Sequence, residues 1–278
     1  EENLIQVLGE GHNQWNYRKD LKSEEDLWQN LRRKITQNNL SEIGENPITD
    51  KEFDSIKIEL LLHTKTPFHA AKWLKGENGI ARITIDREEV SLGSMSLILY
   101  SNQDIGGGIS TYEVVNQIAK RKSDIDDRER RFDVTLLING LPIVQIELKQ
   151  AGAKDGYYQA FNQIKKYAEE GMFRNNIFST LQLFVISNEH TTRYFANALP
   201  KNMDRKFLFS WRPTDNRKVE NIYEFVKQVL NIPDAHRLIA HYTIVSEDND
   251  NKVLMVLHPY QIHAIEALFT SAMKHKSG

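Results

Sequence analysis

Three charged side chains interrupt an otherwise apolar stretch of this chain. Residues 131–149 are typical of two strands joined by an Asn-Gly turn, with Asp133 near the start of the first strand and Glu147 and Lys149 at the end of the second. Because residues two apart in a strand share a face, Glu147 and Lys149 project together. One face of the hairpin therefore builds a core, and the other presents a carboxylate beside an ammonium.

The register of the hairpin decides whether Asp133 joins that pair. A two-residue loop would place Asp133 opposite Ile146, which points to the other face. A three-residue loop over residues 139–141 places Asp133 opposite Glu147, and we predict this register or an equivalent bulge. Neighbouring carboxylates repel unless a cation lies between them, and Mg²⁺ prefers such hard oxygen ligands. A plain half-exposed hairpin with charges on its wet face has the same spacing.

The hairpin has a family resemblance. An Asp followed by Glu-x-Lys on the next strand resembles the active-site motif of the PD-(D/E)xK nucleases. More narrowly, residues 131–150 resemble the nuclease domain of the R subunit of type I restriction-modification enzymes, which carries a run like residues 133–135, 139–142 and 145–149. This resemblance implies an α/β fold, with a restriction-endonuclease-like core of a mixed sheet flanked by helices.

The resemblance also implies roles for individual residues. Asp133 and Glu147 would hold Mg²⁺ together with the backbone carbonyl of Leu148, and Lys149 would lie beside the scissile phosphate. Glu1 would supply the extra acidic residue that this family often brings from its first helix. The implied reaction is metal-assisted hydrolysis of DNA phosphodiester bonds.

A helix is expected directly after the hairpin. Apolar residues at helical spacing predict a helix over residues 155–171, and Gln163 and Tyr167 form a second stripe on it. They fit the Gln-x-x-x-Tyr motif that many of these nucleases place next to the metal site, although such a pair is often only packing. Residues 181–188 then read as a buried strand, and with residues 192–197 they also resemble the R-subunit family.

Other elements follow from patterning. We expect a helix ending near residues 4–8, a helix capped by Ser23, and a polar connection with a short helix over residues 41–55. Strands are expected between residues 56 and 100, notably at 81–85 and 96–100, and a helix over residues 112–119.

Residues 120–131 form a run of mixed charge. Such a run is typical of a solvated face. A second interpretation makes Arg128, Arg130 or Arg131 contacts to DNA phosphates beside the metal site.

The carboxyl end resembles a different family. Residues 254–261 and the expected helix over residues 262–273 resemble the segment that leads into a superfamily 2 helicase motor. This resemblance implies domains at residues 1–245 (endonuclease-like) and 246–278 (start of the motor), with Gln261 as an ATP contact in a longer parent. No Gly-x-x-x-x-Gly-Lys-Ser/Thr occurs, so ATP is expected for that parent only. A plain amphipathic helix with Gln261 in its cap region is the alternative.

Composition limits the function classes. Of 278 residues, 40% are hydrophobic and 27% charged, and neither a membrane span nor a secretory signal is visible. The absence of cysteine excludes disulfides and thiolate metal sites and suits the cytoplasm. A net charge of −2 is unusual for a stand-alone DNA-binding protein. We therefore expect partners to deliver the domain to double-stranded DNA, and the resemblance implies specificity and methyltransferase subunits.

The expected function is that of a Mg²⁺-dependent endonuclease that cuts DNA non-specifically after ATP-driven translocation by the full-length protein. Two alternatives remain open. The domain could be a non-cutting scaffold that docks the motor on its methyltransferase partners, or a regulatory module that couples DNA tension to ATP turnover.

Overall fold

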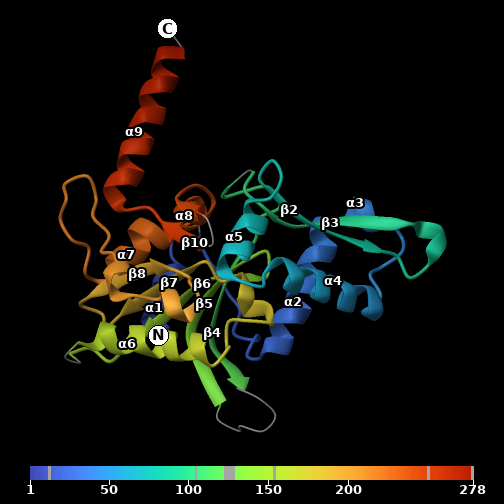
Figure 1. Ribbon diagram of the computed structural model, residues 1–278, viewed down its shortest axis with the longest axis horizontal. Coiled ribbons are helices and arrows are strands. Elements are labelled where there is room, and N and C mark those ends of the chain that lie inside the picture. The colour runs from blue at the N-terminus through green and yellow to red at the C-terminus, as the bar shows by residue number, and fades with distance from the viewer. Residues whose placement is uncertain (12–13, 104, 122–128, 153–154, 249–250, 277–278) are drawn as a thin grey trace.

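A six-stranded mixed sheet forms the centre of the molecule (Figure 1). The computed structural model describes residues 1–278 except 12–13, 104, 122–128, 153–154, 249–250 and 277–278. The strand order is β1-β4-β5-β6-β7-β8, in which β1/β4 and β6/β7 are parallel and the other neighbours are antiparallel. The bounds are β1 Asn16–Tyr17, β4 Tyr112–Arg121, β5 Glu129–Ile138, β6 Leu141–Leu148, β7 Leu183–Ser187 and β8 Thr192–Ala196. A mixed sheet flanked by helices confirms the expected α/β class.

The β5–β6 turn differs from the predicted loop, yet the predicted register holds at the charged end. The turn has two residues, Asn139 and Gly140, both with positive φ (52° and 81°), so the three-residue loop is wrong. A register shift between Leu136 and Leu137 then brings Val134 opposite Ile146. This bulge places Asp133 opposite Glu147, next to the Val134–Ile146 pair. This is the register that the sequence predicts from either a three-residue loop or an equivalent bulge.

Helices cover the sheet and extend beyond it (Figure 1). Their bounds are α1 Glu2–Leu8, α2 Glu24–Asn38, α3 Leu40–Ile43, α4 Asp50–His63, α5 Pro67–Lys75, α6 Gly156–Glu169, α7 Ile222–Phe225, α8 Asp234–His241 and α9 Pro259–Lys276. Shorter turns of helix are η1 Val90–Leu92, η2 Ile177–Thr180, η3 Pro200–Asn202, η4 Arg205–Phe207 and the π-helical η5 Val226–Leu230. The helices expected near the amino end, after Ser23 and after the hairpin are confirmed as α1, α2 and α6.

The helix expected over residues 112–119 is wrong, because this segment is strand β4. It lies between β1 and β5 and pairs with both. Its β-branched and aromatic residues suit a strand, and this pairing between distant segments overrides the helical spacing. The connection over residues 41–55 contains α3 and the start of α4, which continues to His63, so the strands expected from residue 56 begin only at β2.

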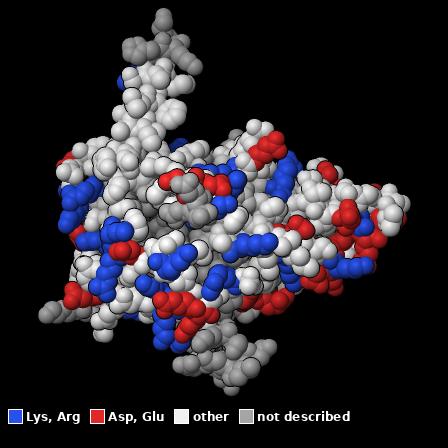
Figure 2. Space-filling model, in the orientation of Figure 1, with Lys and Arg blue, Asp and Glu red and all other residues white. Residues whose placement is uncertain are grey.

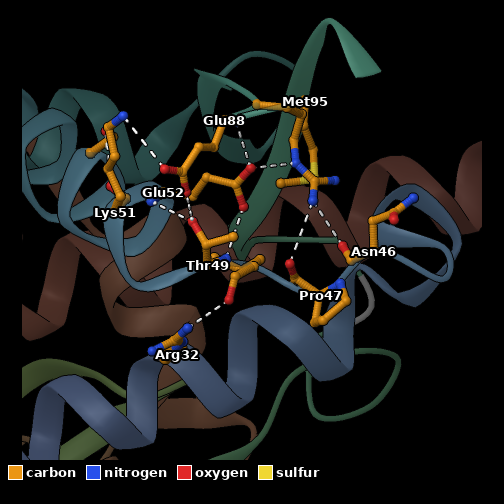
Figure 3. Close-up of polar contacts among 11 residues, drawn as sticks. Arg32, Asn46, Pro47, Thr49, Lys51, Glu52, Glu88 and Met95 are labelled. Atoms are coloured by element: carbon orange, nitrogen blue, oxygen red, sulfur yellow. Dashed lines mark hydrogen bonds and ion pairs between the residues drawn. The ribbon is translucent and has the colours of Figure 1, made fainter. Parts of the chain in front are cut away.

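A second layer lies beside the main sheet. The antiparallel pair of β2 (Ile80–Asp86) and β3 (Ser94–Ser101) packs on α4 and extends as an arm (Figure 1). A buried ion pair fastens this arm, because Arg87 Nε donates to Glu52 Oε1 of α4 at 2.8 Å. Figure 3 shows the Glu52 carboxylate between Thr49 and Glu88, whose backbone N–H groups also donate to it.

The remaining hairpin and the core complete the fold. β9 (Thr243–Asp248) pairs antiparallel with β10 (Asn251–Val256), just before α9. Strands β5 to β7 are buried along most of their length, and the aromatic rings of Phe132, Phe173 and Phe178 pack together against them. Among the described residues, none of the helices combines the length and apolar character that crossing a lipid bilayer requires.

Candidate active site

The three charged residues of the hairpin meet at one edge of the central sheet. Asp133 lies in the middle of β5, Glu147 is the penultimate residue of β6, and Lys149 directly follows that strand. Asp133 Oδ2 accepts a hydrogen bond of 2.7 Å from the backbone N–H of Leu148. Lys149 Nζ lies 3.3 Å from Glu147 Oε1. The structure thus brings together the carboxylates and the ammonium that the sequence predicted to converge.

Glu147 is in an unfavourable place for a negative charge. Its exposed fraction is only 1%. Burial raises the pKa of Glu147 to about 8, and the nearby charge of Asp133 acts in the same direction against the opposing effect of Lys149. Burial also raises the pKa of Asp133, although the hydrogen bond from Leu148 N–H opposes this. The site is therefore short of positive charge.

One carboxylate oxygen shows where a cation would fit. Glu147 Oε2 is buried and has no hydrogen-bond partner among the described residues. A buried carboxylate oxygen without a partner is costly, and a divalent cation would remove that cost. The described residues contain no group of three or more His, Cys, Asp or Glu side chains arranged to hold a metal. At this edge, the two carboxylates and a neighbouring backbone carbonyl are oxygen donors, which is the ligand type that Mg²⁺ prefers.

Helix α6 places two further side chains at this edge. Lys149 Nζ donates to Gln163 Oε1, and Gln163 Nε2 donates to the Tyr167 hydroxyl at 2.7 Å. Burial raises the pKa of Tyr167, and the charge of Glu147 adds to this effect. Lys149 is thus held between Glu147 and Gln163. The helix predicted after the hairpin does bring the Gln-x-x-x-Tyr pair to the charged residues.

Comparison with known proteins identifies the family. The family model described as "Type I restriction enzyme R protein N terminus" matches residues 1–203 of the 278. The chain belongs to this family.

Relatives with curated descriptions agree with this family. The chain is 29% identical over 252 residues to the endonuclease subunit of a type I restriction enzyme from Staphylococcus aureus, covering 91% of this chain and 25% of the relative. It is 31% identical over 253 residues to the corresponding Staphylococcus saprophyticus subunit, with the same coverage. It is 35% identical over 171 residues to the EcoprrI endonuclease subunit of Escherichia coli, covering 58% of this chain and 53% of the relative. The chain thus spans about a quarter of the length of the staphylococcal relatives.

Glu1 lies near the site in this member of the R-protein family. Its charge contributes to raising the pKa of Asp133 and of Glu147. Its Oε1 accepts a hydrogen bond of 2.6 Å from Gln117 Nε2 of β4. Glu1 therefore adds negative charge to this edge while its carboxylate is tied to the neighbouring strand.

The arginines that were candidates for DNA contacts lie in different surroundings. Arg128 falls outside the described residues. Arg131 is exposed on β5. Arg130 pairs with Glu170, at 2.9 Å between Nη2 and Oε1, and its guanidinium carbon lies 5.9 Å from the centre of the Tyr167 ring. Sequence reasoning missed Glu170, whose sequence signal is its place three residues after Tyr167, directly after the end of α6.

Gln261 lies away from the hairpin motif, in the first turn of α9. Its Oε1 accepts a hydrogen bond of 2.9 Å from the backbone N–H of His258. This contact caps the start of the helix, which is the role that the alternative interpretation of the carboxyl end assigns to Gln261.

Proposed function

We propose that this chain is the nuclease part of an R subunit and hydrolyses DNA phosphodiester bonds with Mg²⁺. The observation that carries this proposal is the half-buried Asp133 carboxylate next to the buried Glu147, whose Oε2 is unpartnered among the described residues and lies beside the Lys149 ammonium. The names of the relatives, which are endonuclease subunits, support it. We also propose that the mixed sheet is a PD-(D/E)xK nuclease core.

Each residue has a role in the proposed reaction. Asp133, Glu147 and the carbonyl of Leu148 would hold the Mg²⁺ ion. When bound, the ion supplies a Lewis acid for a phosphate oxygen and lowers the pKa of a water ligand. Lys149 places its ammonium beside the phosphate, where it offsets the negative charge of the transition state. Gln163 accepts a hydrogen bond from Lys149 and so orients it, while Tyr167 holds the Gln163 amide.

The surface charge supports contact with a polyanion on one side of the molecule. Figure 2 shows most of the Lys and Arg side chains of this face on the side of the six-stranded sheet, whereas Asp and Glu are more frequent over the β2–β3 arm. Exposed Lys201, Arg205 and Lys206 lie on η3 and η4 on the sheet side. Basic side chains of this kind neutralise DNA phosphates. We therefore expect double-stranded DNA to approach the sheet side.

For the full-length parent we propose further properties. It would cut DNA non-specifically after ATP-driven translocation, in a cytoplasmic complex with specificity and methyltransferase subunits. Residues 246–278 would begin its motor, with Gln261 as an ATP contact, and residues 1–245 would be the nuclease domain. Strand β9 runs across the proposed boundary between residues 245 and 246.

The test is cleavage by the full-length subunit, assembled with its partners, carrying Asp133→Asn or Lys149→Ala. Each variant should lower the cleavage rate about 1,000-fold, since the lost ion or ammonium supplies several kcal/mol at the transition state. ATP turnover should be unchanged. Lys51→Ala, at an exposed pair with Glu88, serves as the control. Cleavage at the normal rate by both site variants would refute the nuclease proposal and leave the scaffold function.

A further inference from the structure

A partly buried ion pair joins the strand of Asp133 to the helix of Gln163 and Tyr167. Arg130 donates to Glu170 through both Nη2 (2.9 Å) and Nε (3.2 Å), and the side chains are only 18% and 11% exposed. Arg130 lies on β5, three residues before Asp133, and Glu170 directly follows the last residue of α6. A two-point Arg–carboxylate contact fixes both distance and orientation. The pair therefore sets where the end of α6 lies relative to β5.

The ring of Tyr167 is held by the same strand. The Arg130 guanidinium carbon lies 5.9 Å from its centre, and the ring centre of Phe132 lies 5.7 Å away. Both neighbours belong to β5. With its ring confined by them, Tyr167 has one position for its hydroxyl, which accepts the hydrogen bond from Gln163.

The Gln163 amide links the position of the Tyr167 hydroxyl to that of the Lys149 ammonium. An amide has a donor end and an acceptor end, and both are used here. Its Nε2 donates to the Tyr167 hydroxyl, so its Oε1 is turned toward the Lys149 ammonium. If Tyr167 moves away, the amide loses the partner of its donor end and is free to rotate. Rotation by half a turn would bring an NH₂ group against the ammonium, which is repulsive.

We propose that Arg130 and Glu170 are positioning residues that fix Lys149 through Tyr167 and Gln163. This inference rests on the proposed nuclease function and deepens it. It also gives Arg130 a different role from a phosphate contact, because a guanidinium bound at two points by a carboxylate has little net charge left for DNA. Loss of the pair should slow the chemical step while the metal and DNA still bind.

The test uses the full-length subunit in its restriction complex, with Glu170→Gln made alone and in a Tyr167→Phe background. Tyr167→Phe keeps the ring and removes only the hydroxyl. Glu170→Gln alone should lower kcat for cleavage about tenfold, with KM for DNA and the affinity for Mn²⁺ changed less than about twofold. In the Tyr167→Phe background the same substitution should lower kcat hardly any further, because the hydroxyl that connects Tyr167 to Gln163 is already absent.

A matched control exists at the other end of α6. Arg193 pairs with Glu220 at 3.0 Å and lies 5.3 Å from the centre of the Tyr157 ring, so the geometry is similar. Among the described residues, Tyr157 forms no hydrogen bond with Lys149 or Gln163, so Glu220→Gln should leave kcat unchanged. Arg130→Lys provides a second variant that keeps the charge but not the two-point contact, and it should be as slow as Glu170→Gln.

Several results would overturn the inference. One is an equal loss of rate from Glu170→Gln in the wild-type and Tyr167→Phe backgrounds. Another is a KM for DNA that is raised in Arg130→Ala but normal in Arg130→Lys, since a phosphate contact needs only the charge. Asp133→Asn in the same complex separates the two proposals. If it abolishes cleavage while Glu170→Gln behaves additively, only the positioning role fails; if it cuts normally, the nuclease function itself fails.

Discussion

Glu52 and Glu147 are both buried, at 3% and 1% exposure, yet their carboxylates have different partners. Glu52 Oε1 accepts from Arg87 Nε and from Glu88 N–H, and its Oε2 accepts from Thr49 N–H. Glu147 has one oxygen near Lys149, and its other oxygen has no partner among the described residues.

The pKa values of Glu52 and Glu147 are shifted in opposite directions, in agreement with this contrast. Burial alone would raise the pKa of Glu52, but its hydrogen bonds from Arg87, Glu88 and Thr49 lower it below the ordinary value. For Glu147, burial and the charge of Asp133 raise the pKa to about 8. A carboxylate that the protein has satisfied holds the fold together. A buried carboxylate left unsatisfied beside a second acid costs stability, and such groups are typical of functional sites.

The largest expected effect is a difference in stability between two equal substitutions. Glu52→Gln should lower the free energy of unfolding by about 3 kcal/mol, because it leaves Arg87 buried without its counter-charge and turns an amide donor toward backbone donors. Glu147→Gln should leave the metal-free protein as stable as the wild type or more stable, because it removes a poorly paired buried acid. Urea unfolding at pH 7.5 in the presence of a chelator measures both.

Cleavage measured with the same two variants should give the reverse order. Glu147→Gln should abolish it, and Glu52→Gln should keep it at temperatures where the variant is folded. Equal destabilisation by both substitutions would contradict the distinction between the two sites.

Metal binding should have the next largest effect. At a Mg²⁺ concentration of about 100 times the dissociation constant, the free energy of unfolding should rise by about 3 kcal/mol. Asp133→Asn should lose most of this gain, whereas Glu52→Gln should keep it despite its lower starting stability. Thermal melting with and without Mg²⁺ measures the gain, and an unchanged gain in Asp133→Asn would place the ion elsewhere.

The pH dependence of stability should be distinctive. The pKa of Glu147 rises from an ordinary 4.5 to about 8 on folding, so the folded state keeps a proton that the unfolded state releases. As far as this group is concerned, the metal-free protein should therefore be most stable at and below about pH 4.5, and its stability should fall by about 1.4 kcal/mol per pH unit from there to about pH 8. Glu147→Gln should flatten this slope between pH 5 and 8. Unfolding measured at four pH values with a chelator tests it, and a persisting slope would assign the proton to another group.

Local sequence signals predicted much of the hairpin site. Alternation and the Asn-Gly turn predicted β5 and β6, and pairing Asp133 with Glu147 required the bulge that the structure contains between Leu136 and Leu137. The helical stripe of Gln163 and Tyr167 was visible because its spacing is regular. These features depend on residues close together in the chain, so their periodicity could be read directly.

Features that depend on distant residues could not be predicted. Residues 112–119 became a strand because β1 and β5 provide partners on both sides, which no local pattern reveals. The Arg130–Glu170 pair spans 40 residues and the Arg87–Glu52 pair spans 35. In both cases the sequence shows only charged residues of an ordinary kind, and it is the three-dimensional fold that removes them from water.

The smallest expected effects come from the residues that serve each glutamate site. Thr49 caps α4, since its Oγ1 accepts from Glu52 N–H at 3.2 Å while Glu52 Oε2 accepts from Thr49 N–H at 2.9 Å. Thr49→Ala removes that side-chain half of the capping box and should cost about 1 kcal/mol of stability without changing cleavage. Gln163→Ala should slow cleavage without lowering stability. It removes the hydrogen-bond partner of the half-buried Lys149 but little packing. Its unfolding free energy should stay within about 0.5 kcal/mol of the wild type while cleavage slows. Parallel unfolding curves and cleavage rates decide the matter, and a loss of stability confined to Gln163→Ala would mean that this contact serves the fold instead of the reaction.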